Sequence, residues 1–80
     1  MPREEVFRRL NAVFRTYFDD ESITVTDETT ADDIEEWDSF EHIGLIISVE
    51  KEFGIKIPIG KVVSMENVGE MVDIIKGLAD

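Results

Sequence analysis

The sequence contains no cysteine, which excludes disulfide bonds, thiolate metal sites and any reactive thiol supplied by the chain itself. Basic residues are also scarce, because 8 Lys and Arg against 19 Asp and Glu give a formal net charge of −11. Nucleic acid and anionic membranes are therefore not expected as partners, since both are bound through basic patches, and proteins with basic docking patches are favoured. A single histidine excludes a His-rich zinc site.

Long apolar runs are absent as well. No segment is long enough to span a membrane, and the N-terminus lacks the apolar region of a signal peptide. We therefore expect a cytoplasmic monomer without membrane insertion. With 80 residues, 42% of them hydrophobic, the chain is expected to form one compact domain over residues 1–80.

Apolar residues recur at spacings of three and four in three long segments, the pattern of amphipathic helices. The helices are expected at about residues 3–18, 39–53, 59–64 and 67–78, the third being one short turn. The run 55–58 alternates like a strand, but no second strand is available to pair with it. The sequence predicts an all-α fold, a small four-helix bundle of three main helices and one short helix, with a long loop between the first and second helices.

Several residues at the expected helix ends are typical caps. Asp38 is a good N-cap for the second helix, and Gly54 is suited to close it. Asn67 and Glu70 have the spacing of a capping box ahead of the last helix. Gly44, inside the second helix, costs about 1 kcal/mol relative to alanine, so its presence indicates close approach of a partner or of another helix.

The loop before the second helix is long and acidic. Eleven of the 19 acidic residues lie between positions 19 and 41, and no Lys or Arg occurs between Arg15 and Lys51. We expect Ile23 and Ile34, together with Val25, to pin this loop to the core. The loop leads into Ser39, whose hydroxyl should lie in the first turn of the helix, where free N–H groups and the helix dipole favour an attached phosphate.

Metal binding and autonomous catalysis are weak alternatives. The spacing of a calcium-binding EF-hand is absent from the acidic loop, so no metal site is assigned. Ser39 and His42 are three residues apart, but a hydrolase also needs an orienting acid, an oxyanion hole and a closed pocket. No catalytic residue is assigned, and the chain is not expected to be an enzyme. His42 is interpreted as an exposed or half-buried helix residue touching the loop, and Trp37 as a hydrophobic anchor with partner contact as its alternative.

These residues can be compared with a known family. Asp38-Ser39-Phe40, followed by an apolar helix, resembles the D-S-L signature of acyl carrier proteins. The segment 49–58, Val-Glu-Lys-Glu-Phe-Gly-Ile-Lys-Ile-Pro, resembles the end of the family's second helix and its I-x-I-P/S segment. Asn67-Val68 resembles the T-V start of the last helix, so the resemblance covers the chain from the first helix to the end.

The resemblance implies a role for particular residues. Ser39 would receive 4′-phosphopantetheine from coenzyme A through a separate phosphopantetheinyl transferase that uses magnesium, and the thiol of this arm would hold acyl groups as thioesters. Asp38 would cap the helix and contact the transferase. Acyl-loading and acyl-processing enzymes would be the other partners. The resemblance implies partner recognition by Glu41, Glu50, Glu52, Trp37 and Phe40, and an acyl cavity walled by Ile46, Ile57, Val62 and Met65.

Departures from the family pattern indicate a specialised discrete carrier rather than the bulk fatty-acid synthesis one. Phe40 stands where Leu is usual, Gly44 replaces an acidic residue, and the usually acidic segment 59–63 is apolar with one lysine. The carrier would serve fatty-acid, polyketide or related specialised biosynthesis. Three alternatives remain open, which are a peptidyl or aminoacyl carrier, an unmodified acidic interaction domain, and an acid-rich ion buffer.

Overall fold

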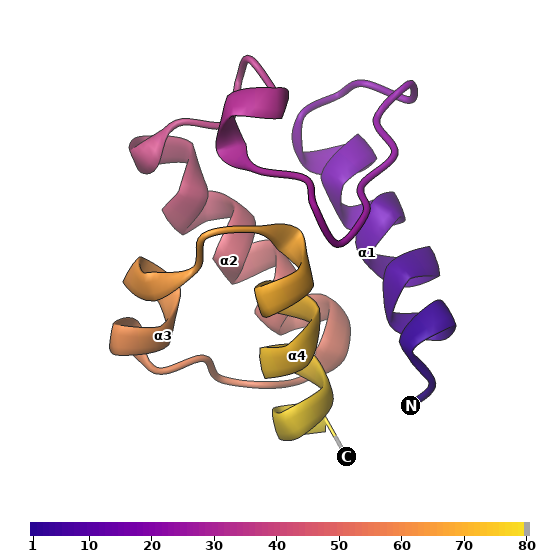
Figure 1. Cartoon of the computed structure of the whole chain (residues 1–80), viewed down its shortest axis with the longest axis vertical. Coiled ribbons are helices and arrows are strands. Elements are labelled where there is room, and N and C mark those ends of the chain that lie inside the picture. Colours follow the sequence, from indigo (N-terminus) through magenta and orange to yellow (C-terminus); the bar gives the residue numbers. More distant parts are fainter. Residues whose placement is uncertain (80) are drawn as a thin grey trace.

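The computed structural model describes residues 1–79 of the chain, and no strand occurs among them. The helices, in chain order, are α1 (Arg3–Tyr17), the 3-10 helix η1 (Ala31–Asp33), α2 (Ser39–Phe53), α3 (Ile59–Ser64) and α4 (Val68–Ala79) (Figure 1). The predicted all-α bundle of three main helices, one short helix and a long first loop is confirmed. The first helix ends one residue before its expected end, the last helix begins and ends one residue later than expected, and η1 is an additional turn inside the loop.

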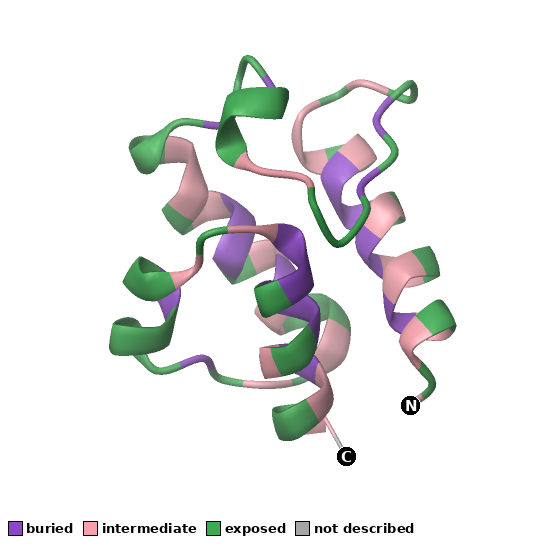
Figure 2. Ribbon diagram, viewed as in Figure 1, coloured by how far each residue is buried: buried purple, intermediate pink, exposed green. Residues whose placement is uncertain are grey.

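The core lies where α1, α2 and α4 meet, and the long loop crosses over one end of these helices (Figure 1). Each of the three contributes one buried stripe, and the opposite sides of the helices are exposed (Figure 2). The fully buried side chains of the largest volume are Phe14, Leu10, Leu45, Met71 and Ile75. Burying side chains of this size contributes about 1.5–3 kcal/mol each, so the packing of these stripes stabilises the helices more than helix propensity does.

The long loop is pinned to the core as expected, because Ile23, Val25 and Ile34 are all buried. The loop also caps α4. Its carbonyl groups at Asp27 and Thr29 accept the first two N–H groups of that helix, at 3.0 and 2.8 Å. These N–H groups have no partner within a helix, so the loop fixes the position of α4.

Gly69 permits this close contact between the loop and α4. A Cβ atom at this position would lie 2.9 Å from both the carbonyl oxygen and a carboxylate oxygen of Asp27. Asn67 caps the same helix with its side-chain oxygen, which accepts the N–H of Glu70 at 2.8 Å. The Glu70 carboxylate returns to the N–H of Glu66 at 3.2 Å and not to that of the N-cap, so only one half of the expected capping box forms.

Helix α2 begins and ends at the expected caps. The Asp38 side chain accepts the N–H of Glu41 at 2.8 Å, and Gly54 closes the helix with a left-handed φ of 66°. The N–H of Gly54 donates to the carbonyl of Glu50. Because both caps follow from local chemistry, Ser39 is placed in the first turn by its immediate neighbours.

Two arginines on α1 connect it to the other elements. Arg3 forms ion pairs with Asp27 of the loop and with Asp73 of α4, the latter at 2.7 Å. Arg9 pairs with Glu52 at the end of α2 at 2.7 Å, and its guanidinium lies 4.7 Å from the centre of the Phe53 ring. These contacts hold two of the four arginines of α1 against acidic groups of the loop, α2 and α4.

Candidate functional site

Ser39 is the first residue of α2 and is exposed to solvent. Its hydroxyl makes no hydrogen bond within residues 1–79, whereas the neighbouring Asp38 carboxylate is engaged as the helix cap. The backbone N–H groups of Ser39 and Phe40 likewise have no acceptor in the described part of the chain. A free hydroxyl next to free N–H groups at the positive end of a 15-residue helix suits a covalently attached phosphate.

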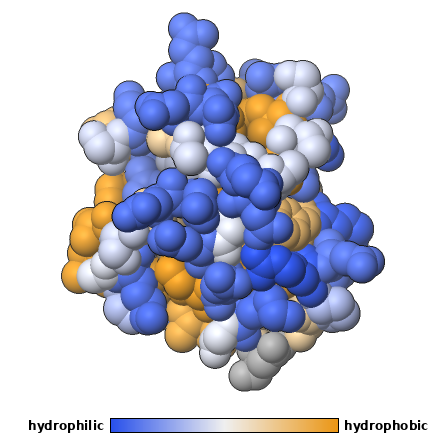
Figure 3. Space-filling view, in the orientation of Figure 1, coloured by the Kyte–Doolittle hydropathy of each residue, from blue (hydrophilic) through white to orange (hydrophobic). Residues whose placement is uncertain are grey.

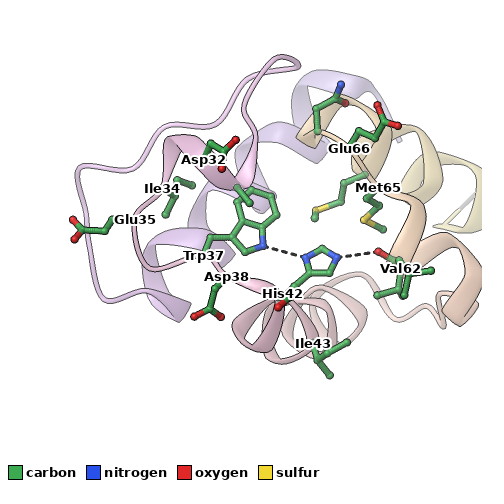
Figure 4. A pocket seen from close by; sticks show the side chains of 15 residues that line it. Asp32, Ile34, Glu35, Trp37, Asp38, His42, Ile43, Val62, Met65 and Glu66 are labelled. Carbon is green, nitrogen blue, oxygen red and sulfur yellow. Dashed lines mark hydrogen bonds between the residues drawn. The ribbon is translucent and has the colours of Figure 1, made fainter.

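A groove of about 670 Å³ opens beside Ser39, between the loop, α2, α3 and the start of α4 (Figure 4). It is lined by Ala31, Asp32, Ile34, Glu35, Trp37, Asp38, Ser39, His42, Ile43, Val62, Val63, Met65, Glu66, Asn67 and Met71. Two of the four expected cavity residues, Val62 and Met65, therefore lie in its wall. The other two do not line it, because Ile46 and Ile57 are buried in the core behind it, at 4% and 7% exposure.

Trp37, His42 and Val62 form a hydrogen-bonded chain across this groove (Figure 4). The indole Nε1–H of Trp37 donates to His42 Nδ1 at 3.0 Å, and His42 Nε2 lies 3.0 Å from the carbonyl oxygen of Val62. An indole N–H can only donate and a carbonyl can only accept, so this arrangement requires a neutral imidazole with its proton on Nε2. The sequence predicted an exposed or half-buried His42 touching the loop; the structure has it half-buried, in contact with the loop, and bonded in addition to α3.

The environment of Trp37 agrees with its interpretation as an anchor. Its side chain is 7% exposed and packs edge-to-face on Phe14 of α1, with ring centres 5.2 Å apart. The ring also stacks on His42 at 5.8 Å. Little of Trp37 is left for direct contact with a partner.

The rim of the groove is acidic. Four of the residues that line it carry carboxylates, Asp32, Glu35, Asp38 and Glu66, and no Lys or Arg is among its lining residues. Asp32 and Glu35 make no ion pair with any residue from 1 to 79. The groove is thus apolar at its base, where Trp37 and the methionines lie, and negative at its edge.

The three glutamates expected to recognise partners are all engaged within the molecule. Glu41 accepts the hydroxyl proton of Tyr17 at 2.6 Å. Glu50 accepts the backbone N–H of Ile57 at 2.7 Å, and Glu52 accepts Arg9 at 2.7 Å. Each carboxylate would have to share or exchange its internal partner to bind a basic residue of another protein. The contacts of Glu41 and Glu52 could not be predicted from the sequence, because they join positions 24 and 43 residues apart.

Tyr17 explains the glycine inside α2. A Cβ atom on Gly44 would lie 2.0 Å from the Tyr17 hydroxyl oxygen, so the phenol of α1 occupies the space of a side chain there. Its hydrogen bond to the Glu41 carboxylate raises the pKa of Tyr17 above its usual value, with a further contribution from burial. Gly44 was the sequence signal for this contact, and the close approach comes from another helix.

The surface next to Ser39 is largely apolar. The side chains of Phe40, Ile43 and Ile47 on α2 are exposed, Phe40 to 81%. On α3 the exposed apolar side chains are Ile59 and Val63, and apolar surface gathers on the side of the molecule where α3 lies (Figure 3). Phe40 is therefore the expected recognition residue that is most accessible.

Comparisons with known proteins support the same interpretation. No family model matches the chain. A curated acyl carrier protein of Lactobacillus acidophilus is 28% identical over 76 residues, which cover 95% of each chain. The solution NMR structure of a holo acyl carrier protein from Geobacter metallireducens superimposes with a TM-score of 0.84 at 40% identity, covering 90% of this chain and 83% of that one. This chain belongs to the acyl carrier protein family.

Membership of the acyl carrier protein family confirms the resemblance drawn from the motif around Ser39. Acyl carrier proteins carry acyl groups and work with partner enzymes rather than catalysing reactions, so the expectation that the chain is not an enzyme is also confirmed. Over residues 1–79, no helix has the length and apolar character needed to cross a bilayer. Within the same residues, no group of three or more His, Asp or Glu side chains is arranged to hold a metal ion.

Proposed function

We propose that this acyl carrier protein holds acyl groups as thioesters on a 4′-phosphopantetheine arm joined to the Ser39 hydroxyl through a phosphodiester. The observation that carries the proposal is the exposed, unpartnered hydroxyl of Ser39 at the start of α2, next to a groove large enough for an arm or a small cargo. The chain has no cysteine, so any thioester chemistry needs an added thiol. The Geobacter relative was solved in its holo form, which supports a prosthetic group.

The residues around Ser39 fit the attached group. A phosphodiester on the hydroxyl would lie beside the free N–H groups of Ser39 and Phe40, which stabilise a negative charge. When bound, the arm supplies a thiol that forms and releases thioesters. The chain itself contributes the attachment point, the exposed position and the groove. A separate transferase would supply the magnesium ion and the coenzyme A, and the carrier would work as a cytoplasmic monomer.

The decisive test is intact mass after incubation with coenzyme A, magnesium and a broad-specificity phosphopantetheinyl transferase. We expect one phosphopantetheine addition to the natural chain and none to Ser39→Ala. Ser64→Ala is the matched control, because Ser64 is also exposed and lies at the end of α3, and it should be modified like the natural chain. No addition to a folded natural chain would refute the proposal and leave an unmodified acidic interaction domain.

Asp38 has two roles in this proposal, as the cap of α2 and as a contact for the transferase. The two can be separated, because asparagine caps a helix as well as aspartate does but carries no charge. Asp38→Asn should keep the stability of the natural chain and raise the KM of the transferase for it. Asp38→Ala should in addition lose about 1 kcal/mol of stability. Unchanged modification kinetics in Asp38→Asn would assign Asp38 to capping alone.

Partner recognition is proposed to rest more on Phe40 than on the glutamates of α2. Phe40 is freely accessible beside Ser39, whereas Glu41, Glu50 and Glu52 have internal partners. Phe40→Ala should raise the KM of the transferase, and Glu50→Gln should do so less. The reverse order would show that charge on α2 governs recognition.

We propose a specialised carrier in fatty-acid, polyketide or related biosynthesis, and the engaged glutamates and apolar α3 support this over a bulk fatty-acid role. An aminoacyl cargo is the second candidate, favoured by one observation. The groove beside Ser39 is rimmed by carboxylates with no Lys or Arg among its lining residues, which favours a cargo carrying an ammonium group. The protein can be loaded with aminoacyl and acyl groups of equal length, and the thermal midpoint of each loaded form measured in low salt. Only the aminoacyl form should have a higher midpoint than the protein that carries the unloaded arm.

A further inference from the structure

Helix α3 forms one wall of the groove and is attached to the bundle by few contacts. It has six residues, of which only Val62 is buried. Its other apolar side chains point to solvent, since Ile59 is 70% and Val63 72% exposed. Elements with so few buried contacts are the first to open in a folded protein. The position of α3 therefore depends on Val62 and on whatever binds its backbone.

His42 supplies the main polar tie between α3 and the rest of the molecule. Its Nε2–H donates to the Val62 carbonyl, and no backbone N–H among residues 1–79 donates to that carbonyl. Its Nδ1 accepts the indole N–H of Trp37, and Trp37 is itself packed on Phe14 in the core. The chain of contacts thus runs from the core through His42 to α3 (Figure 4).

This tie lies between the groove and the apolar core. His42 and Val62 line the groove, whereas Ile46 does not. Ile46 is one turn further along α2, on the face that His42 shares, and it is buried. A long apolar chain that passed from the groove toward Ile46 and Ile57 would have to separate α3 from His42.

We propose that His42 determines the cargo of this carrier by locking α3 to Trp37, which confines the acyl group to the groove beside Ser39 and closes the core to long apolar chains. The inference rests on the proposed attachment of the arm at Ser39. Opening the lock would leave the Trp37 N–H and the Val62 carbonyl without partners in a part-buried place, and this cost opposes the entry of an acyl chain into the core. Short acyl groups are then the natural cargo.

The first experiment measures how well the carrier shelters acyl chains of increasing length. Acyl groups of two to twelve carbons are loaded from acyl-coenzyme A by the transferase, and hydroxylamine cleavage of each thioester is timed against the same acyl-coenzyme A. In the natural chain the ratio of the two rates should stay within about twofold at all lengths. In His42→Leu it should fall about tenfold from the shortest to the longest chain, as the longer chains become buried.

A conservative variant separates the hydrogen bonds from general packing. Glutamine can accept at one atom and donate at the other, as His42 does, so His42→Gln should behave like the natural chain. His42→Ala should follow His42→Leu and serves if the leucine variant does not fold. Falling ratios in the natural chain, or flat ratios in both apolar variants, would overturn the proposal.

A second experiment does not depend on whether Ser39 is modified by a transferase. Because the chain has no cysteine, Ser39→Cys gives a unique thiol to which alkyl groups of different lengths can be attached as mixed disulfides. The thermal midpoint should not change with alkyl length while His42 is present, and it should rise with length once His42→Leu is added. Failure of the transferase to load Ser39 would refute the carrier proposal. The same dependence of the thermal midpoint on alkyl length with His42 and with His42→Leu would refute the lock.

Discussion

The contact between Tyr17 and Gly44 shows how one side chain can fix the residue type on a neighbouring helix. The phenol of α1 lies over the α2 backbone and is held there by the Glu41 carboxylate. A Cβ atom at position 44 would lie 2.0 Å from the hydroxyl oxygen, well inside van der Waals contact. The better helix propensity of alanine is therefore outweighed at this position by steric overlap.

Gly44→Ala should lower the free energy of unfolding by about 1–3 kcal/mol, because Tyr17 must leave its place or α1 must shift. Urea denaturation measures the change. Gly77→Ala is the matched control, since Gly77 also lies in a helix but has no atom within 4 Å of the added Cβ. That control should gain stability, by up to about 1 kcal/mol. Equal effects of the two substitutions would show that Tyr17 does not restrict position 44.

Tyr17 should titrate above the usual tyrosine pKa of about 10, because its hydroxyl donates to the Glu41 carboxylate. It is the only tyrosine, so the absorbance of tyrosinate reads its pKa directly. Glu41→Ala should return this pKa toward the usual value. Since the folded pKa is raised, the stabilisation is present below about pH 10 and is lost as the pH rises through the folded value. Identical tyrosine titration curves for the natural protein and Glu41→Ala would contradict the hydrogen bond between Tyr17 and Glu41.

At the scale of elements, α4 depends on the loop as much as on its own residues. Its first two N–H groups are satisfied by loop carbonyls, and its N-cap Asn67 satisfies a third. The loop in turn is held by Arg3, which pairs with Asp27 and with Asp73 of α4. Opening of the loop should therefore expose the start of α4 in the same step.

Gly69→Ala should disrupt the contact between the loop and the start of α4. The added Cβ would lie 2.9 Å from the Asp27 carbonyl oxygen, and a backbone atom cannot move away as a side chain does. We expect a loss of about 1–3 kcal/mol in stability and faster hydrogen exchange at the Val68 amide, which donates to the loop carbonyl. Gly60→Ala is the control, because Gly60 lies in α3 with open space around an added Cβ. This substitution should change the stability by no more than about 1 kcal/mol and should leave hydrogen exchange at Val68 unchanged. Unaltered exchange in Gly69→Ala would show that the loop does not hold α4.

The features of the fold and the site that could be predicted from the sequence are those set by residues close together in the chain. The start of α2 at Ser39 and its end at Gly54 were predicted, because caps act within a few residues. The internal partners of Glu41 and Glu52 were not, because they come from α1 and depend on how the helices pack. For the same reason the groove wall could be assigned to Val62 but not separated from the buried Ile46.

For the whole molecule, the dominant electrostatic feature is repulsion among acids. The net charge is −11, and most of the arginines are already paired, so much of the acidic loop faces no positive charge. Glu35 and Glu36 are exposed and have no ion pair within the described residues. Such charges are screened over about 10 Å at 0.1 M salt, so adding salt should stabilise the compact fold.

Neutralising two acids in the loop and neutralising two acids at the start of α1 should change the free energy of unfolding in opposite directions, although both changes reduce the negative charge equally. Glu35→Gln with Glu36→Gln removes repulsion and should raise the free energy of unfolding by about 1 kcal/mol at low salt. Glu4→Gln with Glu5→Gln should lower it, since these acids lie in the first turn of α1 and Glu5 pairs with Arg8. Urea denaturation in low salt and in half-molar sodium chloride measures both, and the difference should shrink in high salt. If both double substitutions stabilised the fold alike, net charge alone would govern the stability of the fold. The position of the acids near Ser39 would then make no contribution of its own.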